Sequence, residues 1–252
     1  KAFFKKLKYT PHEIADAIVI DLINLYEKVN FLYLKFTGKY FFLKKNKILK
    51  NTHKEERIFV LGNAPSLNNF DLKKLKNEII IMVNRSFDHP DYEIIKPKYH
   101  IFVDPKLATG VWPLSYIDEI YKKNPNVKLI FNSEWYYFEK FKEFRDKKNV
   151  FWVKSKSISL LFNNFNNNLS DNISTMGVIG HAISSAIYLG SKKIYILGVE
   201  LNGIIKLLAD KDSHFSGKDP DYRNHTSWEW ARDLNISSRG FRIWHRFNDH
   251  CK

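Results

Sequence analysis

The chain has 252 residues, 44% of them apolar and 15% aromatic, which is enough for one large hydrophobic core. Lys and Arg total 41 against 27 Asp and Glu, a formal charge of +14, so we expect anionic partners such as phosphorylated small molecules, nucleic acid or an acidic membrane surface. The single cysteine, Cys251, excludes an intramolecular disulfide. The sequence shows neither a secretory signal nor a run of about 18 apolar residues. We therefore expect a cytoplasmic protein, either free or peripheral on the inner face of the cytoplasmic membrane.

The first 50 residues differ in pattern from the rest of the chain, and we expect a basic, amphipathic helical extension over residues 1–50. Thr10, Pro11 and Glu13 predict a helix start, because a threonine cap, a proline in the first turn and a glutamate three residues after the cap form a capping box. The segment that follows is strongly apolar but carries acidic residues, and lysine-rich stretches flank it. Such a helix lies on an anionic bilayer, packs on the core or pairs with a second subunit in a homo-oligomer. The sequence leaves these three alternatives open.

From residue 57 onward, apolar runs alternate with helical patterns. This rhythm predicts an α/β, Rossmann-like domain over residues 51–252, with a mainly parallel sheet and helices on both faces. The expected strands span residues 57–62, 78–83, 99–104, 127–132, 149–153, 192–199 and 240–245. The expected helices span residues 115–123, 134–146, 177–189 and 225–235. We expect the asparagine-rich stretch 163–172 to be a loop and residues around 201–224 to form a short lid.

Polar residues follow most of the expected strands. In an open parallel sheet, ligands bind outside the carboxyl ends of the strands, near the switch in strand order. The candidates at these ends are Gly62, Asn63, Ser66, Asn84, Asp104, Glu200 and Asn202.

The turn after the first strand, GNAPS, is the most informative of these ends. We interpret Gly62 as permitting close approach of a ligand to the backbone, Asn63 as an amide donor, and Ser66 as the cap of a short helix whose N–H groups bind phosphate. The motif is neither a P-loop nor a G-x-G-x-x-G fingerprint, and a plain strand-to-helix connection is the alternative.

Two later segments complete the expected site. Residues 174–190 predict a helix with small residues on one face, in which we interpret His181 as a packed histidine. The polar segment 210–225 carries His214, a candidate general base if the segment overhangs the site; an ordinary solvated loop is the alternative. Two Asp-x-Asp pairs in this segment end no strand, so we expect no metal site, and no cofactor is indicated.

The combination GNAPSL, VNRSF, FVDPKL, STMG, LGSKKIYILGVELNG and DSHFSG resembles the bacterial sialyltransferases that decorate lipooligosaccharide. It also resembles their relatives among flagellin-modifying and pterin-diphosphokinase-like proteins with a G-N-x-P-S-L start. The resemblance covers roughly residues 57–235 and lies in motifs rather than in continuous sequence. It implies a metal-independent, inverting glycosyltransferase with a cytidine-monophosphate-linked sugar donor and a glycan or glycolipid acceptor in surface-glycan synthesis.

Carried over by position, the resemblance also implies roles for individual residues. His214, in Ser-His-Phe-x-Gly, matches the histidine that deprotonates the acceptor hydroxyl. The positions that contact the donor's nucleotide, sugar, carboxylate or phosphate are Asn63, Ser66, Asn84, Asp104, Ser174, Thr175 and Gly177.

The chain departs from the pattern of that family in four ways: the lid before His214 is much shorter, the glycine helix is about two residues longer, and two site positions carry other residues. Asp104 stands where the family usually has asparagine, and Glu200-Leu201-Asn202 stands where it usually has a tyrosine that supports the leaving phosphate. Tyr222 or Arg223 is our candidate replacement for that support.

Two other functions are consistent with the residues. The first is a diphosphokinase that acts on a pterin-like alcohol and needs ATP and magnesium. The second is a basic nucleic-acid-binding protein without catalytic activity, which we rank lowest because no RRM-like or helix-turn-helix signature occurs, so we expect no nucleic-acid partner.

Overall fold

The computed structural model of the chain describes residues 10–159, 165–175, 177–217 and 226–251. Its strands are β1 (Arg57–Leu61), β2 (Ile79–Val83), β3 (Tyr99–Phe102), β4 (Lys128–Asn132), β5 (Val150–Lys156), β6 (Asn172–Ser174) and β7 (Lys193–Leu197). Its α-helices are α2 (Pro11–Phe36), α3 (Tyr92–Ile95), α4 (Pro105–Thr109), α5 (Ser115–Lys123), α6 (Gly177–Tyr188), α7 (Gly203–Leu208) and α8 (Ser227–Cys251). Short 3₁₀ helices connect them: η1 (Phe41–Leu49), η2 (Pro65–Asn69), η3 (Leu72–Leu75), η4 (Asn84–Asp88), η5 (Ser133–Tyr137) and η6 (Glu139–Phe144).

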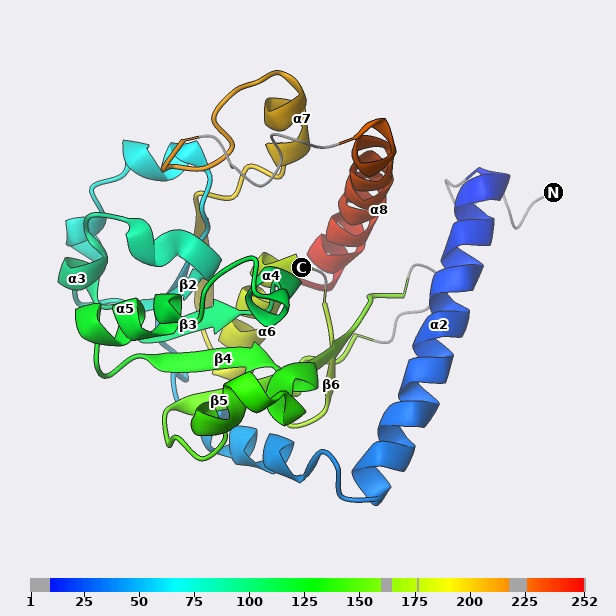
Figure 1. Ribbon diagram of the computed structural model, residues 1–252, viewed down its shortest axis with the longest axis horizontal. Helices are drawn as coiled ribbons and strands as arrows, with labels where there is room; N and C mark the ends of the chain where they lie inside the picture. Colours follow the sequence, from blue (N-terminus) through cyan, green and yellow to red (C-terminus); the bar gives the residue numbers. More distant parts are fainter. Residues whose placement is uncertain (1–9, 160–164, 176, 218–225, 252) are drawn as a thin grey trace.

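The described strands form one parallel sheet in the order β6-β5-β4-β3-β2-β1-β7. From β1 the chain adds strands in one direction as far as β6, and it then returns through α6 to place β7 on the other side of β1 (Figure 1). The strand order therefore reverses between β1 and β7, which is the switch point where open sheets of this kind bind ligands. The predicted α/β, Rossmann-like fold is confirmed.

The two faces of the sheet bury two separate hydrophobic layers, because neighbouring residues of each strand point to opposite faces. Phe59 and Leu61 of β1 belong to one layer, which also contains Phe131 and Trp152 and is rich in aromatic side chains. Ile58 and Val60 belong to the other layer, which α6 and part of α2 cover. Strands buried on both faces explain why the sequence shows continuous apolar runs rather than alternation.

The predicted start of the first long helix is confirmed. The Thr10 hydroxyl accepts a hydrogen bond from the Glu13 backbone N–H at 3.3 Å, and the Glu13 carboxylate accepts one from the Thr10 N–H at 2.7 Å. The hydrogen bond from the Thr10 N–H, with a second one from the Thr10 hydroxyl at 3.0 Å, stabilises the carboxylate and lowers the pKa of Glu13. Within the described residues, no helix combines the length and the apolar character that crossing a membrane requires.

Two secondary-structure predictions were wrong. Residues 240–245, predicted to be a strand, continue α8. Residues 134–146 form the two 3₁₀ helices η5 and η6 instead of one α-helix, and Phe138 between them is extended. The loop predicted over 163–172 is confirmed for its described residues 165–171, and its last residue, Asn172, starts β6.

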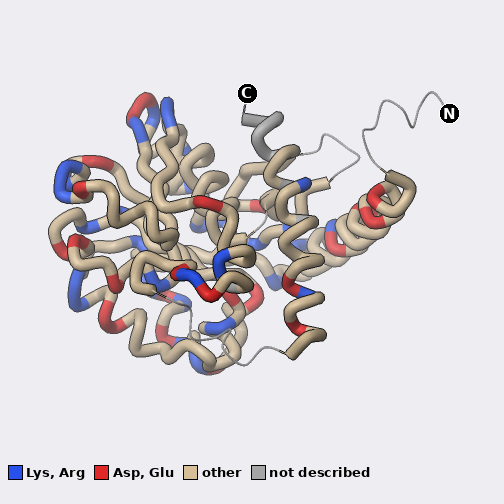
Figure 2. Tube along the Cα trace, turned by 90° about the horizontal axis from the view of Figure 1, so that it is seen from above, with Lys and Arg blue, Asp and Glu red and all other residues tan. Residues whose placement is uncertain are grey.

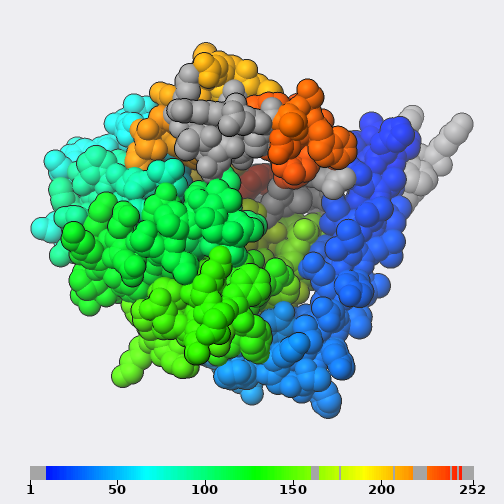
Figure 3. Space-filling model, viewed as in Figure 1, coloured from blue at the N-terminus to red at the C-terminus, as the bar shows by residue number. Residues whose placement is uncertain are grey.

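Basic and acidic residues are interspersed along the body of the protein rather than separated onto different sides (Figure 2). The helix α2 forms a separate ridge beside the body, next to α8 (Figure 3).

Candidate functional site

A cavity of about 720 Å³ lies at the carboxyl ends of β1, β2 and β3. We call it the strand-end pocket. The turn after β1, the start of η4 and the segment 104–112 form its floor, and residues 213–216 with parts of α7 and α8 enclose it from other sides. Its position beside the β1–β7 switch point is the one that the strand order favours for ligand binding.

Four of the residues predicted from the sequence line this pocket together: Asn63, Asn84, Asp104 and His214. They come from four separate segments of the chain. The other described candidates, Gly62, Ser66, Ser174, Thr175, Gly177, Glu200 and Asn202, are not among the lining residues. Tyr222 and Arg223 lie outside the described residues.

The segment that carries His214 is fastened to the turn after β1. His214 and Gly217 exchange two backbone hydrogen bonds, at 3.1 and 3.0 Å, which close a tight loop. The Phe215 N–H donates to the Asn63 carbonyl at 2.7 Å, and the Asn68 side chain donates to the Phe215 carbonyl at 3.0 Å. These bonds hold the His214 segment against the GNAPSL turn, and His214 and Asn63 both line the pocket.

Asn84 adopts a backbone conformation that few residues other than glycine adopt. Its φ is +46°, in the left-handed region that asparagine tolerates better than most residues. The buried ring of His100 holds this turn: its Nε2 lies 2.7 Å from the Asn84 carbonyl, and its Nδ1 lies 3.1 Å from the Tyr92 hydroxyl. Burial lowers the pKa of His100 to about 4, so the ring is neutral at pH 7. The neutral ring donates from Nε2 to the carbonyl and accepts from the tyrosine.

Asp104 has a structural role as well as its place in the pocket. Its carboxylate accepts a hydrogen bond from the Lys106 N–H at 3.0 Å and caps α4. This cap keeps the carboxylate at the end of β3.

The Ser66 backbone N–H, expected to bind phosphate, has a partner within the protein. It donates to the Glu200 carboxylate at 2.9 Å, and the same carboxylate is paired with Lys206. These two contacts, with the Lys206 hydrogen bond the stronger, lower the pKa of Glu200 to about 2. Ser66 is also the second residue of η2 rather than its cap. A phosphate at this N–H would therefore have to displace Glu200.

Gly62 has a packing reason that the sequence did not indicate. A Cβ added there would lie 2.4 Å from the Gly198 carbonyl oxygen and 2.7 Å from a methyl group of Val199. The ends of β1 and β7 thus approach each other more closely than a side chain on residue 62 permits.

The residues at the start of α6 are packed inside the protein, although the buried Thr175 hydroxyl has no hydrogen-bond partner there. Ser174 accepts a hydrogen bond from the Asn166 N–H at 3.1 Å. A Cβ on Gly180 would lie 2.2 Å from the hydroxyl oxygen of Thr175, which is buried. His181 is buried, with its Nδ1 2.7 Å from the Gly177 carbonyl, and burial lowers its pKa to about 4. The interpretation of His181 as a packed histidine is confirmed.

Several pocket residues were missed by the sequence analysis. Lys106 lies with its Nζ 5.4 Å from the ring centroid of Trp112, and both residues line the pocket. Arg232 and Asp233, an ion pair at 3.3 Å, enter from α8. Arg85 directly follows Asn84 in VNRSF, and Lys106 stands two residues after Asp104 in FVDPKL, so both places were readable from those motifs. Trp112, Arg232 and Asp233 come from segments whose position depends on tertiary packing.

Four polar atoms at the pocket are buried and have no hydrogen-bond partner within the protein. They are Asn63 Oδ1, Asn84 Oδ1, Trp112 Nε1 and Ser213 Oγ. Buried polar atoms without a partner also occur elsewhere in the described chain, for example Thr175 Oγ1 and Ser184 Oγ, so these four do not by themselves distinguish the pocket. No group of three or more His, Cys, Asp or Glu side chains suited to a metal ion occurs among the described residues.

A family model described as "6-hydroxymethylpterin diphosphokinase MptE-like" matches residues 35–204. The match covers the ends of β1, β2 and β3 and stops before His214 and α8. No curated protein sequence matches the chain.

One similar solved structure is the MAf glycosyltransferase from Magnetospirillum magneticum AMB-1. It is 13% identical, and the alignment covers 64% of this chain and 28% of the MAf chain with a TM-score of 0.39.

Proposed function

The chain belongs to the MptE-like family, and from this membership we propose that it is a transferase whose substrate carries a phosphate group and binds in the strand-end pocket. The observation that carries the proposal is that Asn63, Asn84, Asp104 and His214, which come from four separate segments, line one cavity beside the β1–β7 switch point. Amide, carboxylate and imidazole groups offer both donors and acceptors, which a sugar or a heterocyclic base can pair with.

The charges at the pocket support an anionic ligand. Arg85, Lys106 and Arg232 line it, against the two carboxylates of Asp104 and Asp233. Basic side chains near a bound phosphate stabilise the negative charge that develops when a phosphate is the leaving group.

The reaction that we propose first is glycosyl transfer from a nucleotide-activated sugar, with a cytidine-monophosphate-linked donor. His214 accepts the proton of an acceptor hydroxyl while that oxygen forms a bond to the anomeric carbon. The bond from the anomeric carbon to the donor phosphate breaks, and the nucleotide leaves with the electron pair. The motif resemblance that gives the histidine of Ser-His-Phe-x-Gly this role supports the assignment.

The description of the family favours a second reaction, diphosphate transfer to a hydroxymethyl group of a pterin-like alcohol. In that case the alcohol oxygen attacks the β-phosphorus of ATP, its proton passes to a base, and AMP leaves. His214 has the same task in both reactions, so the two differ in their donor.

Thermal unfolding with added nucleotides separates the two reactions. CMP, CDP, UDP, GDP, ADP and ATP are each tested with magnesium and with a chelator, because a ligand that binds the folded state raises the melting temperature by mass action. A shift with CMP that survives the chelator supports glycosyl transfer, and a shift with ATP that needs magnesium supports diphosphate transfer. If no nucleotide shifts the melting temperature under either condition, the proposed function is wrong.

The His214→Ala variant tests the base. We expect turnover of the donor that the nucleotide screen identifies to fall by about 10²–10⁴, while the melting-temperature shift caused by the nucleotide remains. The control is His12→Ala, which removes an exposed imidazole near the start of α2 and should leave turnover unchanged. Equal turnover in the His214 variant and the wild type would remove His214 from the mechanism.

A further inference from the structure

The helix α2 turns its charged side chains toward the body of the protein. Arg242 of α8 pairs with Glu13 at 3.3 Å and with Asp16 at 3.2 Å. The Ser159 hydroxyl donates to the Asp21 carboxylate at 2.9 Å. The same side of α2 buries Ala17 and Phe31 in the core, so both charged and apolar side chains of the helix face the body.

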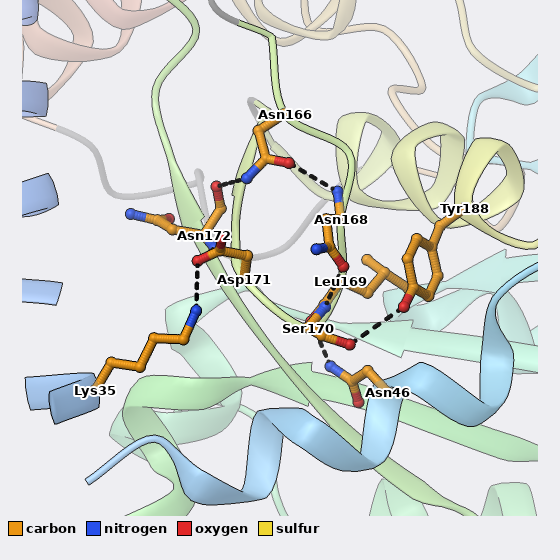
Figure 4. A network of polar contacts seen from close by, with 9 residues as sticks. All are labelled: Lys35, Asn46, Asn166, Asn168, Leu169, Ser170, Asp171, Asn172 and Tyr188. Carbon is orange, nitrogen blue, oxygen red and sulfur yellow. Dashed lines mark hydrogen bonds and ion pairs between the residues drawn. The ribbon is translucent and has the colours of Figure 1, made fainter. Parts of the chain in front are cut away.

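The far end of α2 is held in the same way. Lys35 pairs with Asp171 at 3.3 Å. Asp171 belongs to the asparagine-rich segment that precedes β6, where Asn166, Asn168 and Asn46 bond the backbone (Figure 4). Polar contacts therefore fix α2 to the body at both ends and set which face points outward.

The outward face of α2 carries an apolar stripe with a seven-residue repeat. Its members follow one another at alternating spacings of four and three residues, and all are exposed in the monomer. They are Ile18 (46% exposed), Leu22 (61%), Leu25 (58%), Val29 (60%), Leu32 (53%) and Phe36 (93%). We call these six residues the α2 seam. Alternation of three and four is the spacing of the a and d positions of a coiled coil.

Three further exposed side chains widen the seam along one edge. Val19, Tyr26 and Tyr33 follow one another at seven-residue spacing and are 54%, 71% and 65% exposed. Such a continuous apolar strip on a helix is what a second helix covers when the two pack side by side.

The area of this strip suits a protein interface. At about 200 Å² for a fully exposed aromatic side chain, Tyr26, Tyr33 and Phe36 together offer roughly 450 Å². This is more than half of the roughly 800 Å² that each partner contributes to a standard interface. The five aliphatic side chains of the seam add to it.

Charge favours a second copy of the chain over a bilayer as the partner. Helices that lie on anionic bilayers are rich in Lys and Arg on their polar face. Here α2 carries four acidic residues and two lysines, a formal balance of −2. Three of the four acidic groups, those of Glu13, Asp16 and Asp21, are held at the body by Arg242 and Ser159, so they do not lie on the outward face.

We propose that α2 is a dimerisation helix, which pairs along its seam with α2 of a second copy of this chain. This surface is separate from the strand-end pocket, so the proposal stands whether or not the proposed function does. Most of the seam also lies before residue 35, where the family match begins.

The test measures molar mass in solution. For the full chain we expect about twice 29.9 kDa by light scattering or sedimentation, with dissociation to monomers on dilution over about a hundredfold range. Leu22→Glu places a charge in the seam and should give a monomer. The matched control is Ile23→Glu, at the neighbouring residue, which is 53% exposed and lies off the seam; it should remain a dimer. Circular dichroism checks that both variants are folded.

Three results would overturn the proposal. The first is a wild-type chain that is monomeric at every concentration. The second is loss of the dimer to the same extent in Leu22→Glu and Ile23→Glu, since the seam would then have no special part. The third is a monomer that co-sediments with vesicles of phosphatidylglycerol and phosphatidylcholine, with equal loss of this binding in both variants. That result would assign the outward face of α2 to a bilayer.

Discussion

At the scale of single residues, the pocket depends on a histidine that does not line it. His100 is fully buried behind Asn84 and donates a hydrogen bond to the carbonyl of that residue. This bond helps to hold the left-handed backbone of Asn84, a conformation that costs of order 1–3 kcal/mol. His100 is therefore a positioning residue for the Asn84 side chain.

The pKa of His100 predicts how stability depends on pH. In the folded protein its pKa is about 4, below the ordinary value of 6.5. Between these pH values the unfolded chain binds a proton that the folded chain does not. The stability that the neutral, buried ring of His100 contributes is therefore fully present above about pH 6.5 and is lost as the pH falls toward 4. We expect His100 to contribute up to about 1.4 kcal/mol of unfolding free energy per pH unit in this window.

The variant His100→Phe tests this account. It keeps an aromatic ring but leaves the Asn84 carbonyl and the Tyr92 hydroxyl unpaired, so we expect a loss of about 1–3 kcal/mol for each group at pH 7. The unfolding free energy, measured in urea at pH values between 7 and 5, should also change less per pH unit than in the wild type. His12→Phe is the control, in which this pH dependence should be that of the wild type. An identical slope in His100→Phe would contradict the assignment, because a merely structural ring would lower stability without changing its pH dependence.

At the scale of elements, the close approach of the ends of β1 and β7 requires glycine at residue 62. Gly62→Ala would bring a Cβ to 2.4 Å from the Gly198 carbonyl, which is backbone and cannot rotate away. We expect the two strand ends to separate, with a loss of about 1–3 kcal/mol in unfolding free energy measured in urea. Because Asn63 directly follows, nucleotide binding should weaken as well.

Gly203→Ala is the matched control for this prediction. Gly203 begins α7, after β7, and an added Cβ there meets no atom within 4 Å. Alanine in a helix is favoured over glycine by about 1 kcal/mol, so this variant should be as stable as the wild type or slightly more stable. If both glycine variants lost stability equally, close packing of β1 against β7 would not be the reason for Gly62.

The elements that the sequence predicted well are those that local pattern decides. The buried strands at 57–61 and 79–83 are continuous apolar runs, and the start of α2 has a complete capping box. The error at 240–245 arose because a short aromatic run fits a strand and a buried helix equally. A second capping box, Thr226 with Glu229, starts α8, and no proline follows it before residue 245. Gly240 is a typical helix stop, yet the helix continues through it, so the local pattern did not mark where α8 ends.

The same contrast between local sequence pattern and tertiary packing applies to the predicted site. Asn63, Asn84 and Asp104 were found because parallel strands bring their carboxyl ends to one edge. Trp112 and Arg232 were not, since a loop and a distant helix deliver them by tertiary packing. The contact of Glu200 with the Ser66 N–H was likewise hidden, because it joins residues 134 positions apart.

At the scale of the whole molecule, α8 connects the strand-end pocket to α2. Its early turns supply Arg232 and Asp233 to the pocket, and Arg242, ten residues later, pairs with Glu13 and Asp16. Ten residues of helix span about 15 Å. A rigid helix that is anchored at one place and lines a binding site at another transmits a change between the two.

Removing the anchor of α8 should therefore weaken ligand binding from a distance. For Arg242→Ala we expect the nucleotide identified by the thermal screen to bind with about 0.5–2 kcal/mol less free energy, roughly a twofold to thirtyfold weaker Kd by calorimetry. The control is Lys35→Ala, which also removes an ion pair between α2 and the body, the one with Asp171, but which involves no residue of α8. Unchanged binding in both variants would mean that the pocket-lining turns of α8 hold their place without α2, whereas equal weakening in both would trace the effect to α2 itself and not to α8.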